Sequence, residues 1–120
     1  MAQKGQERRR YPRVAEKLPL KISSEGSYIV TETKNISPKG AYCMIKGKLP
    51  DMCKVEVTLL VPTKAGADAP RKKVVCTGTV IRQEPPHADE SCPAALLFEN
   101  ISKTDERLLS KYVDRIVADY

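Results

Sequence analysis

Six short runs of alternating apolar and β-branched residues, each bounded by turn residues, occupy most of this 120-residue chain. In VEVTLLV, at 55–61, four apolar side chains share one face by the strand period of two: Val55, Val57, Leu59 and Val61. The other runs are LPLKIS (18–23), YIVTETKN (28–35), AYCMIK (41–46), VVCTGTVIR (74–82) and AALLFEN (94–100). Because no helical pattern separates them, we expect antiparallel pairing in a barrel or a sandwich.

The last twenty residues change to a helical period. Their apolar side chains fall three or four positions apart, at Leu108, Leu109, Tyr112, Val113, Ile116 and Val117. Ser102 or Thr104 can cap the start, and Asp105 and Glu106 stand in the first turn, where carboxylates favour the helix dipole. The spacing predicts a helix over about 103–118 whose apolar face packs against the β-body.

The connections between strands carry less information. Two polar loops, at 62–73 and 84–93, are long, and Gly78 within a strand indicates a bulge or a bend. No apolar run approaches the roughly 20 residues of a membrane span, and the first residues lack the apolar core of a signal peptide. We therefore expect one cytoplasmic domain without membrane insertion.

The sequence gives little support for a metal site or for an enzyme active site. The four cysteines (Cys43, Cys53, Cys76 and Cys92) form no Cys-x-x-Cys pair, and His87 is the only histidine, so neither a zinc site nor a disulfide framework is expected. His87 lies close to Asp89 and Ser91, but triad members usually come from separate elements. The sequence predicts no enzyme, no catalytic residues, no metal and no cofactor.

The net charge of +6 is concentrated at one end of the chain. Residues 1–21 carry seven basic and two acidic side chains, whereas the remainder is nearly neutral. This asymmetry indicates an anionic partner that binds through the N-terminal segment.

The opening stretch QERRRYPRV places Arg9 and Arg13 four positions apart, with Pro12 between them. Proline disfavours helix at the preceding Tyr11, so the segment is expected to be a loop that leads into the first strand. Arginine presents a planar fork that binds phosphate oxygens bidentately or grips the O6 and N7 edge of guanine. A basic tail of no particular ligand has the same composition, so this motif alone decides nothing.

A second motif lies between two predicted strands and reads NISPKG, residues 35–40. Asn35 and Ser37 offer short hydrogen-bonding side chains, and Gly40 permits positive φ or a close approach of the backbone to a ligand. An ordinary β-turn has the same composition. Each motif is therefore weak when taken alone.

Together, Arg-x-x-x-Arg, about twenty residues of strand, Asn-x-Ser-x-x-Gly and a terminal helix resemble the PilZ family of cyclic di-GMP receptors, over about residues 8–120. The resemblance implies a six-stranded antiparallel β-barrel plus a C-terminal helix, an all-β fold otherwise. It implies a flexible basic arm at 1–14 ahead of a barrel at 15–120. It also implies that cyclic di-GMP binds the barrel exterior. Arg9 and Arg13 would clamp its phosphates and guanine edges, and Arg8 would add a contact. Asn35 and Ser37 would hydrogen-bond guanine, and Gly40 would keep the turn close to the ligand.

The implied function is a non-enzymatic second-messenger receptor whose arm becomes ordered on binding and signals to a downstream protein partner that the sequence does not identify. Two alternatives stay open. The first is a basic β-barrel that binds nucleic acid, which is disfavoured because aromatic residues make up only 5% of the chain. The second is a PilZ domain that binds no ligand and acts as a protein-interaction module. The sequence departs from many relatives at Ala94 and Ala95, where a glycine is common. Arg82 is either a further contact or a solvated charge.

Overall fold

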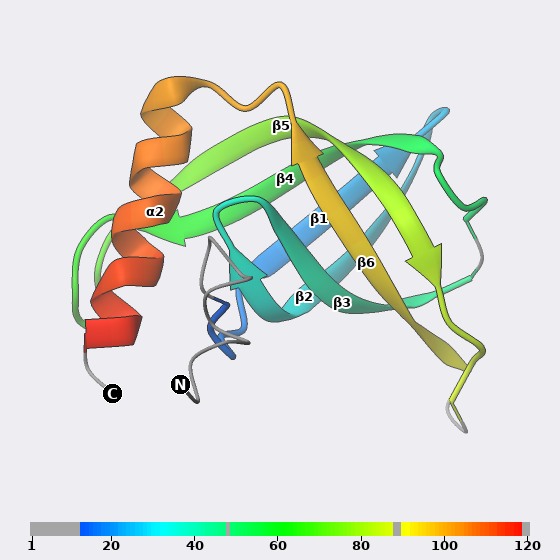
Figure 1. Cartoon of the computed structure of the whole chain (residues 1–120), viewed down its shortest axis with the longest axis horizontal. Coiled ribbons are helices and arrows are strands. Elements are labelled where there is room, and N and C mark those ends of the chain that lie inside the picture. Colours follow the sequence, from blue (N-terminus) through cyan, green and yellow to red (C-terminus); the bar gives the residue numbers. More distant parts are fainter. Residues whose placement is uncertain (1–12, 48, 88–89, 119–120) are drawn as a thin grey trace, which may run out of the picture.

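The computed structural model describes residues 13–47, 49–87 and 90–118, which form six strands followed by one helix (Figure 1). The strands are β1 (Pro19–Ser24), β2 (Ser27–Ser37), β3 (Gly40–Lys46), β4 (Lys54–Pro62), β5 (Arg71–Gln83) and β6 (Ser91–Glu99), and the helix is α2 (Lys103–Ala118). All neighbouring strands pair antiparallel in the order β1-β2-β3-β6-β5-β4, and β4 pairs with β1 to close the ring. The predicted six-stranded antiparallel barrel with a C-terminal helix is confirmed.

The barrel interior follows from the period of two. Val55, Val57, Leu59 and Val61 of β4 all point inward, as predicted, and each is at most 4% exposed. They pack with the inward residues of the other five strands in one continuous apolar core. Closure leaves no strand of this sheet with an unpaired edge, which removes the usual site of edge-to-edge aggregation.

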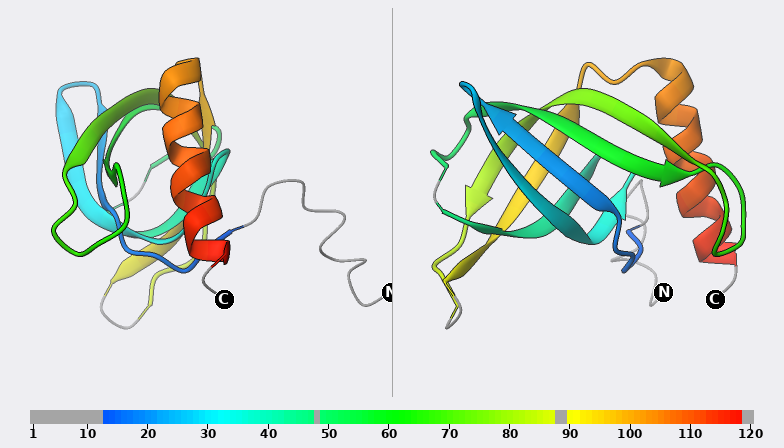
Figure 2. Two further views of the ribbon diagram at one scale, coloured as in Figure 1. Left: turned by 90° about the vertical axis from the view of Figure 1, so that its left-hand side faces the viewer. Right: turned by 180° about the vertical axis from the view of Figure 1, so that it is seen from behind.

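Helix α2 lies across one end of the barrel (Figure 2). The Ser102 side-chain oxygen caps it by accepting a hydrogen bond from the amide of Asp105 at 3.1 Å. The buried face consists of Leu109, Tyr112 and Val113, which join the barrel core. The helical period therefore predicted the bounds of α2 and most of the face that covers the barrel end, but not that Val117, in the last turn, is 41% exposed.

Several boundaries differ from the sequence expectations. Strand β2 continues through Ser37, so that the predicted turn at 35–40 contains only Pro38 and Lys39. The two long loops shorten to 63–70 and 84–90 because β5 and β6 begin earlier than predicted. Gly78 pairs regularly with both neighbours, and the register shift of β5 lies instead between Val80 and Arg82.

The four cysteines are free thiols that divide by exposure. Cys43 and Cys76 are buried, as expected of small apolar core residues, whereas Cys53 and Cys92 are partly exposed. Burial disfavours the thiolate, and it raises the pKa of Cys43 to about 12 and, with a smaller contribution from Asp105, that of Cys76 to about 11. Both buried thiols are therefore protonated at neutral pH in the folded protein.

A thiol-labelling experiment tests this division. At pH 8, iodoacetamide is expected to modify Cys53 and Cys92 in the folded protein, and Cys43 and Cys76 only after unfolding. Mass spectrometry identifies the modified cysteines. Because the pKa values of the buried thiols are raised above their unfolded values, their contribution to stability is complete below about pH 8.5. It is lost as the pH rises toward 11–12. Rapid native labelling of Cys43 would contradict the described core.

Candidate ligand-binding site

The first described residues run beside the end of β2. Val14 and Ile36 form an isolated antiparallel bridge with two backbone hydrogen bonds of 2.9 Å. Both side chains point into the core, where Val14 is 1% and Ile36 0% exposed. Since neighbours along an extended chain face opposite ways, exposed Arg13 points outward, and the antiparallel register places it opposite Ser37. Arg13 of the first motif and Ser37 of the second are thus adjacent across this bridge.

Thr33 fastens the segment that follows Arg13. Its hydroxyl donates to the carbonyl oxygen of Glu16 at 2.6 Å and accepts from the amide of Leu18 at 2.9 Å. The amide of Thr33 also donates to the carbonyl oxygen of Leu18 at 3.0 Å. We call Thr33 and residues 14–18 the clasp. Val14, which the sequence placed in the arm at 1–14, is therefore packed in the barrel body.

Two of the predicted site residues, Arg8 and Arg9, lie outside the described residues, as does the rest of the arm through residue 12. Arg13 is thus the one arginine of the opening motif whose position the structure gives. Its backbone leaves the clasp next to the β2–β3 hairpin.

A β-bulge sets the direction of Asn35. The pairing of β2 with β3 shifts by one residue between Thr33 and Asn35, so that Lys34 and Asn35 together face Tyr42. Thr33 and Ile36 on either side both point inward. With regular alternation from Thr33, Asn35 would point into the core, and the bulge instead turns its amide to the surface, where it is partly exposed.

The Ser37 side chain is occupied within its own hairpin. Its oxygen accepts a hydrogen bond from the amide of Lys39 at 3.2 Å, and its hydroxyl donates to the carbonyl oxygen of Gly40 at 3.4 Å. Ser37 is 6% exposed. Lys39 ties the turn to the rest of the fold, because its carbonyl accepts from the amide of Phe98 at 2.8 Å and its ammonium pairs with Glu106 of α2 at 3.0 Å. The β2–β3 hairpin is therefore held in place by these contacts, and it forms a rigid platform beside Arg13.

Gly40 has a structural reason to be glycine. A Cβ at this position would collide with the backbone carbonyl of Leu96 on the neighbouring strand β6. Its φ is not in the left-handed region, where Gly26, Gly47 and Gly66 are found. The close approach at Gly40 is therefore one between two strands of the barrel, β3 and β6.

Replacing Gly40 by alanine is expected to lower the free energy of unfolding by about 1–3 kcal/mol, because the backbone of β6 must move to admit the methyl group. Urea denaturation measures the change. The control is Lys46→Ala at the exposed end of the same strand, with an expected effect within about 0.5 kcal/mol. An equally small effect of Gly40→Ala would show that β6 moves aside freely.

The outer face extends from the bulge across three more strands. Tyr42 pairs with Asn35 on one side and with Ala95 on the other, and Ala95 pairs with Arg82. Glu84 connects two residues of this row, because it accepts from the Tyr42 hydroxyl at 3.4 Å and lies 3.6 Å from the Arg82 guanidinium. Desolvation, followed by the nearby Glu84 carboxylate, raises the pKa of Tyr42. We call Asn35, Tyr42, Ala95 and Arg82 the outer row.

Sequence reasoning missed Tyr42. The alternation of AYCMIK places its side chain opposite to those of Ala41 and Cys43, and hence outside the barrel, but only the strand order reveals that it adjoins Asn35. Arg82 likewise reaches this face through pairing with β6. The short side chain of Ala95 stands in register between those of Tyr42 and Arg82 on the two neighbouring strands.

The described part of the chain contains neither a metal-binding cluster nor a membrane-spanning helix. No three His, Cys, Asp or Glu side chains gather there in a way that could hold a metal ion. None of its helices combines the length and the apolar character needed to cross a membrane.

Comparison with known proteins assigns the fold independently. The family model described as PilZ domain matches residues 7–115. The structure of the Bacillus subtilis inhibitor of motility (MotI/DgrA) aligns with a TM-score of 0.80 at 19% identity, covering 92% of this chain and 52% of that one. Escherichia coli YcgR in complex with c-di-GMP aligns with a TM-score of 0.71 at 16% identity, over 93% of this chain and 47% of that one.

The PilZ domain of Escherichia coli YcgR with c-di-GMP aligns with a TM-score of 0.63 at 16% identity, over 93% of this chain and 98% of that domain. The chain thus spans about half the length of the first two proteins and nearly all of the isolated domain. No curated protein sequence matches the chain. At these identities the structural matches establish the fold alone.

Proposed function

The chain belongs to the PilZ domain family, and from this premise we propose that it is a non-enzymatic receptor that binds cyclic di-GMP on the outside of its barrel. One observation carries the proposal: the Val14–Ile36 bridge brings Arg13 opposite Ser37 and beside the outward-turned Asn35. Guanidinium and amide groups then face the same small patch from two distant parts of the sequence.

The chemistry of the ligand matches these groups. Cyclic di-GMP carries two phosphodiester charges and two guanines, and an arginine fork binds either a phosphate or the O6 and N7 edge of guanine. In this proposal Arg9 and Arg13 clamp the ligand, Arg8 adds a contact, and Asn35 hydrogen-bonds guanine. Because the Ser37 hydroxyl is already engaged in the hairpin, its contribution is chiefly to hold the turn, and its oxygen has one further acceptor site.

The outer row extends the proposed surface. In this proposal a planar base stacks on the ring of Tyr42 and packs over the short side chain of Ala95, next to Asn35. The Arg82 guanidinium lies at the far end of this row and pairs with Glu84 at 3.6 Å, which offsets part of its charge. Arg82 therefore belongs to the rim of the proposed site rather than to its centre.

The proposed signal is the ordering of the arm. The segment from Val14 onward is already held by the clasp, so the change is confined to residues before Arg13 and pivots at that residue. Ligand binding would fix the arm against the barrel and so create a surface for a downstream protein partner. The two YcgR structures contain c-di-GMP, and its binding by this chain is our proposal.

Isothermal titration calorimetry with cyclic di-GMP tests the proposal. We expect saturable heat at a stoichiometry of one or two ligands per chain, and none with cyclic di-AMP, which lacks the O6 acceptor of guanine. Absence of heat at high protein concentration would contradict the receptor function and favour a module that binds only proteins. The titration is to be run at two salt concentrations.

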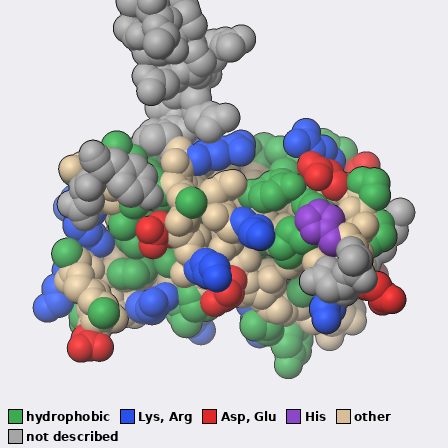
Figure 3. Space-filling view, turned by 90° about the horizontal axis from the view of Figure 1, so that it is seen from below, with side chains coloured by type: hydrophobic (Ala, Val, Ile, Leu, Met, Phe, Trp, Pro, Cys, Tyr) green, Lys and Arg blue, Asp and Glu red, His purple; other side chains and the backbone are tan. Residues whose placement is uncertain are grey.

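The salt dependence separates a receptor from a nucleic-acid-binding barrel. An interface that neutralises about five phosphates should lose affinity with a log–log slope near −4, whereas a cyclic dinucleotide should depend on salt far less. On the face seen in Figure 3, the described Lys and Arg side chains lie among acidic and apolar ones rather than in one basic stripe. A steep slope with an oligonucleotide and no heat with cyclic di-GMP would overturn the proposal.

A further inference from the structure

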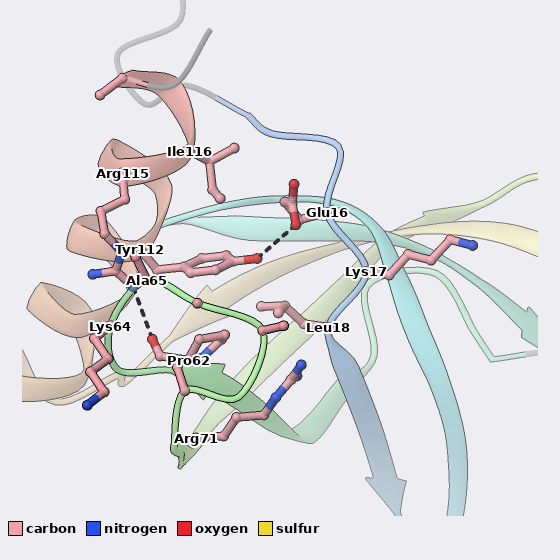
Figure 4. Close-up of a pocket in the computed structure, with 14 residues that line it drawn as sticks. Glu16, Lys17, Leu18, Pro62, Lys64, Ala65, Arg71, Tyr112, Arg115 and Ile116 are labelled. Atoms are coloured by element: carbon pink, nitrogen blue, oxygen red, sulfur yellow. Dashed lines mark hydrogen bonds between the residues drawn. The ribbon is translucent and has the colours of Figure 1, made fainter.

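A second concave surface lies at the barrel end covered by α2. A cavity of about 420 Å³ opens between α2, the loop at 63–70 and the clasp residues 16–18 (Figure 4). Part of its wall is apolar and consists of the side chains of Leu18, Ala65 and Ile116 and the ring of Tyr112. A cavity of this size, with an apolar wall and a few polar groups, is typical of small-molecule sites.

The polar groups of this cavity are mainly cationic. Arg71 comes from the start of β5 and Arg115 from the last turn of α2, while Glu16 is the only acidic residue among the described residues that line the cavity. In Figure 4, Arg115 lies beside the Tyr112 ring and Arg71 reaches toward Leu18, whereas Lys17 and Lys64 point away. Two guanidinium groups therefore border one hollow.

Neither arginine is neutralised within the described part of the chain. The ion pairs found there do not include Arg71 or Arg115. Arg115 donates one long hydrogen bond, of 3.4 Å, to the carbonyl oxygen of Pro62. Because a guanidinium carries five N–H groups, most of its donor capacity remains for another acceptor.

The Tyr112 hydroxyl also faces this cavity, and both arginines act on it electrostatically. This hydroxyl donates to the carboxylate of Glu16 at 3.3 Å. Burial, with help from Glu16, raises the pKa of Tyr112 to about 12, while Arg71 and Arg115 act in the opposite direction. Both arginines are thus within electrostatic reach of the phenol oxygen, which stays protonated at neutral pH.

We propose that this cavity binds a small organic anion, a phosphate monoester or a carboxylate with a compact apolar body. The anionic group lies between Arg71 and Arg115, on the side away from Glu16, because the Glu16 carboxylate repels it. The apolar body packs on Leu18, Ala65 and the Tyr112 ring. This site goes beyond the proposed receptor function and does not depend on it.

The test is an NMR titration of the ¹⁵N-labelled full chain, in phosphate-free buffer at constant ionic strength, with phenyl phosphate and benzoate as probes. We expect saturable shifts of the amide signals of Gly66, Ala67 and Ile116, which line the cavity. Arg71→Gln or Arg115→Gln should weaken binding about tenfold, the effect of losing a charged hydrogen-bonding partner. Tighter binding of one probe identifies phosphate or carboxylate as the preferred group.

The matched control is Arg107→Gln, an exposed arginine of α2 outside the cavity, which should change the affinity less than twofold. Ser37→Val should leave probe binding intact, because the proposed cyclic di-GMP surface is separate. Dispersed amide spectra report that each variant folds, and Arg71→Lys tests the charge if Arg71→Gln does not fold. Shifts that do not saturate, or equal losses in Arg107→Gln and Arg115→Gln, would overturn the proposal.

Discussion

Replacing Arg13 by alanine is expected to weaken the binding of cyclic di-GMP by about thirtyfold or more, a loss of roughly 2 kcal/mol or more for a central arginine anchor. Arg13 is exposed, yet the residue after it is bridged to Ile36. The guanidinium therefore starts from a fixed point next to the hairpin, and less freedom is lost when it grips the ligand. Calorimetry measures the loss directly.

Two further variants separate charge from geometry at this position. Arg13→Lys keeps the charge but lacks the fork, and we expect it to recover only part of the affinity. Arg107→Ala removes an equally exposed arginine from α2 and should bind like the unaltered protein. If Arg107→Ala and Arg13→Ala weakened binding equally, the arginine would act only through net charge, and the proposed site would be wrong.

Replacing Thr33 by valine is expected to lower the free energy of unfolding by roughly 2–4 kcal/mol. The new side chain has nearly the same shape but leaves the buried amide of Leu18 and the carbonyl of Glu16 without their partner, at about 1–3 kcal/mol each. Binding of cyclic di-GMP should weaken as well, although Thr33 faces the core and touches no ligand. The reason is that the clasp positions Arg13.

Urea denaturation and calorimetry on the same samples check both effects. Thr58→Val makes the same chemical change at a partly exposed position of β4 outside the clasp, and it should leave the affinity unchanged. A stable Thr33→Val protein with full affinity would mean that the position of Arg13 does not depend on the clasp.

Much of this fold could be predicted because its strongest patterns are local. The period of two in β4 predicted which residues face inward, and the helical period with a Ser102 cap predicted the extent of α2. The closure of the sheet into a barrel could not be predicted from the residue pattern alone. Alternating strands fit a sandwich as well, and only the resemblance to a family selected six strands in one ring.

The candidate site was harder because its geometry depends on pairing between distant residues. Nothing local marks the bulge at Lys34 that turns Asn35 outward, since the register shift arises from the match between β2 and β3. The sequence predicts a strand that ends at Asn35 and a turn after it, whereas β2 continues through Ser37. Tyr42 was missed for the same reason: its place beside Asn35 is a fact of strand order.

The role of Gly40 shows how a motif residue can serve the fold. The sequence motif associated this glycine with a ligand, but the space that a side chain would need is taken by the backbone of Leu96. Ser37 is similar, because its oxygen holds the hairpin together. These two residues build the platform, and the contacts that we expect to carry affinity come from the arginines and from Asn35.

The central claim is that the arginine segment and the β2–β3 hairpin touch one and the same ligand molecule. Its most direct test is an NMR titration with cyclic di-GMP that follows the side-chain Nε–H of Arg13 and the backbone amides of Asn35 and Lys39. The account predicts that all three signals move together, with one dissociation constant and one end point. Movement of the Arg13 signal alone, with the hairpin amides unchanged at saturation, would contradict it.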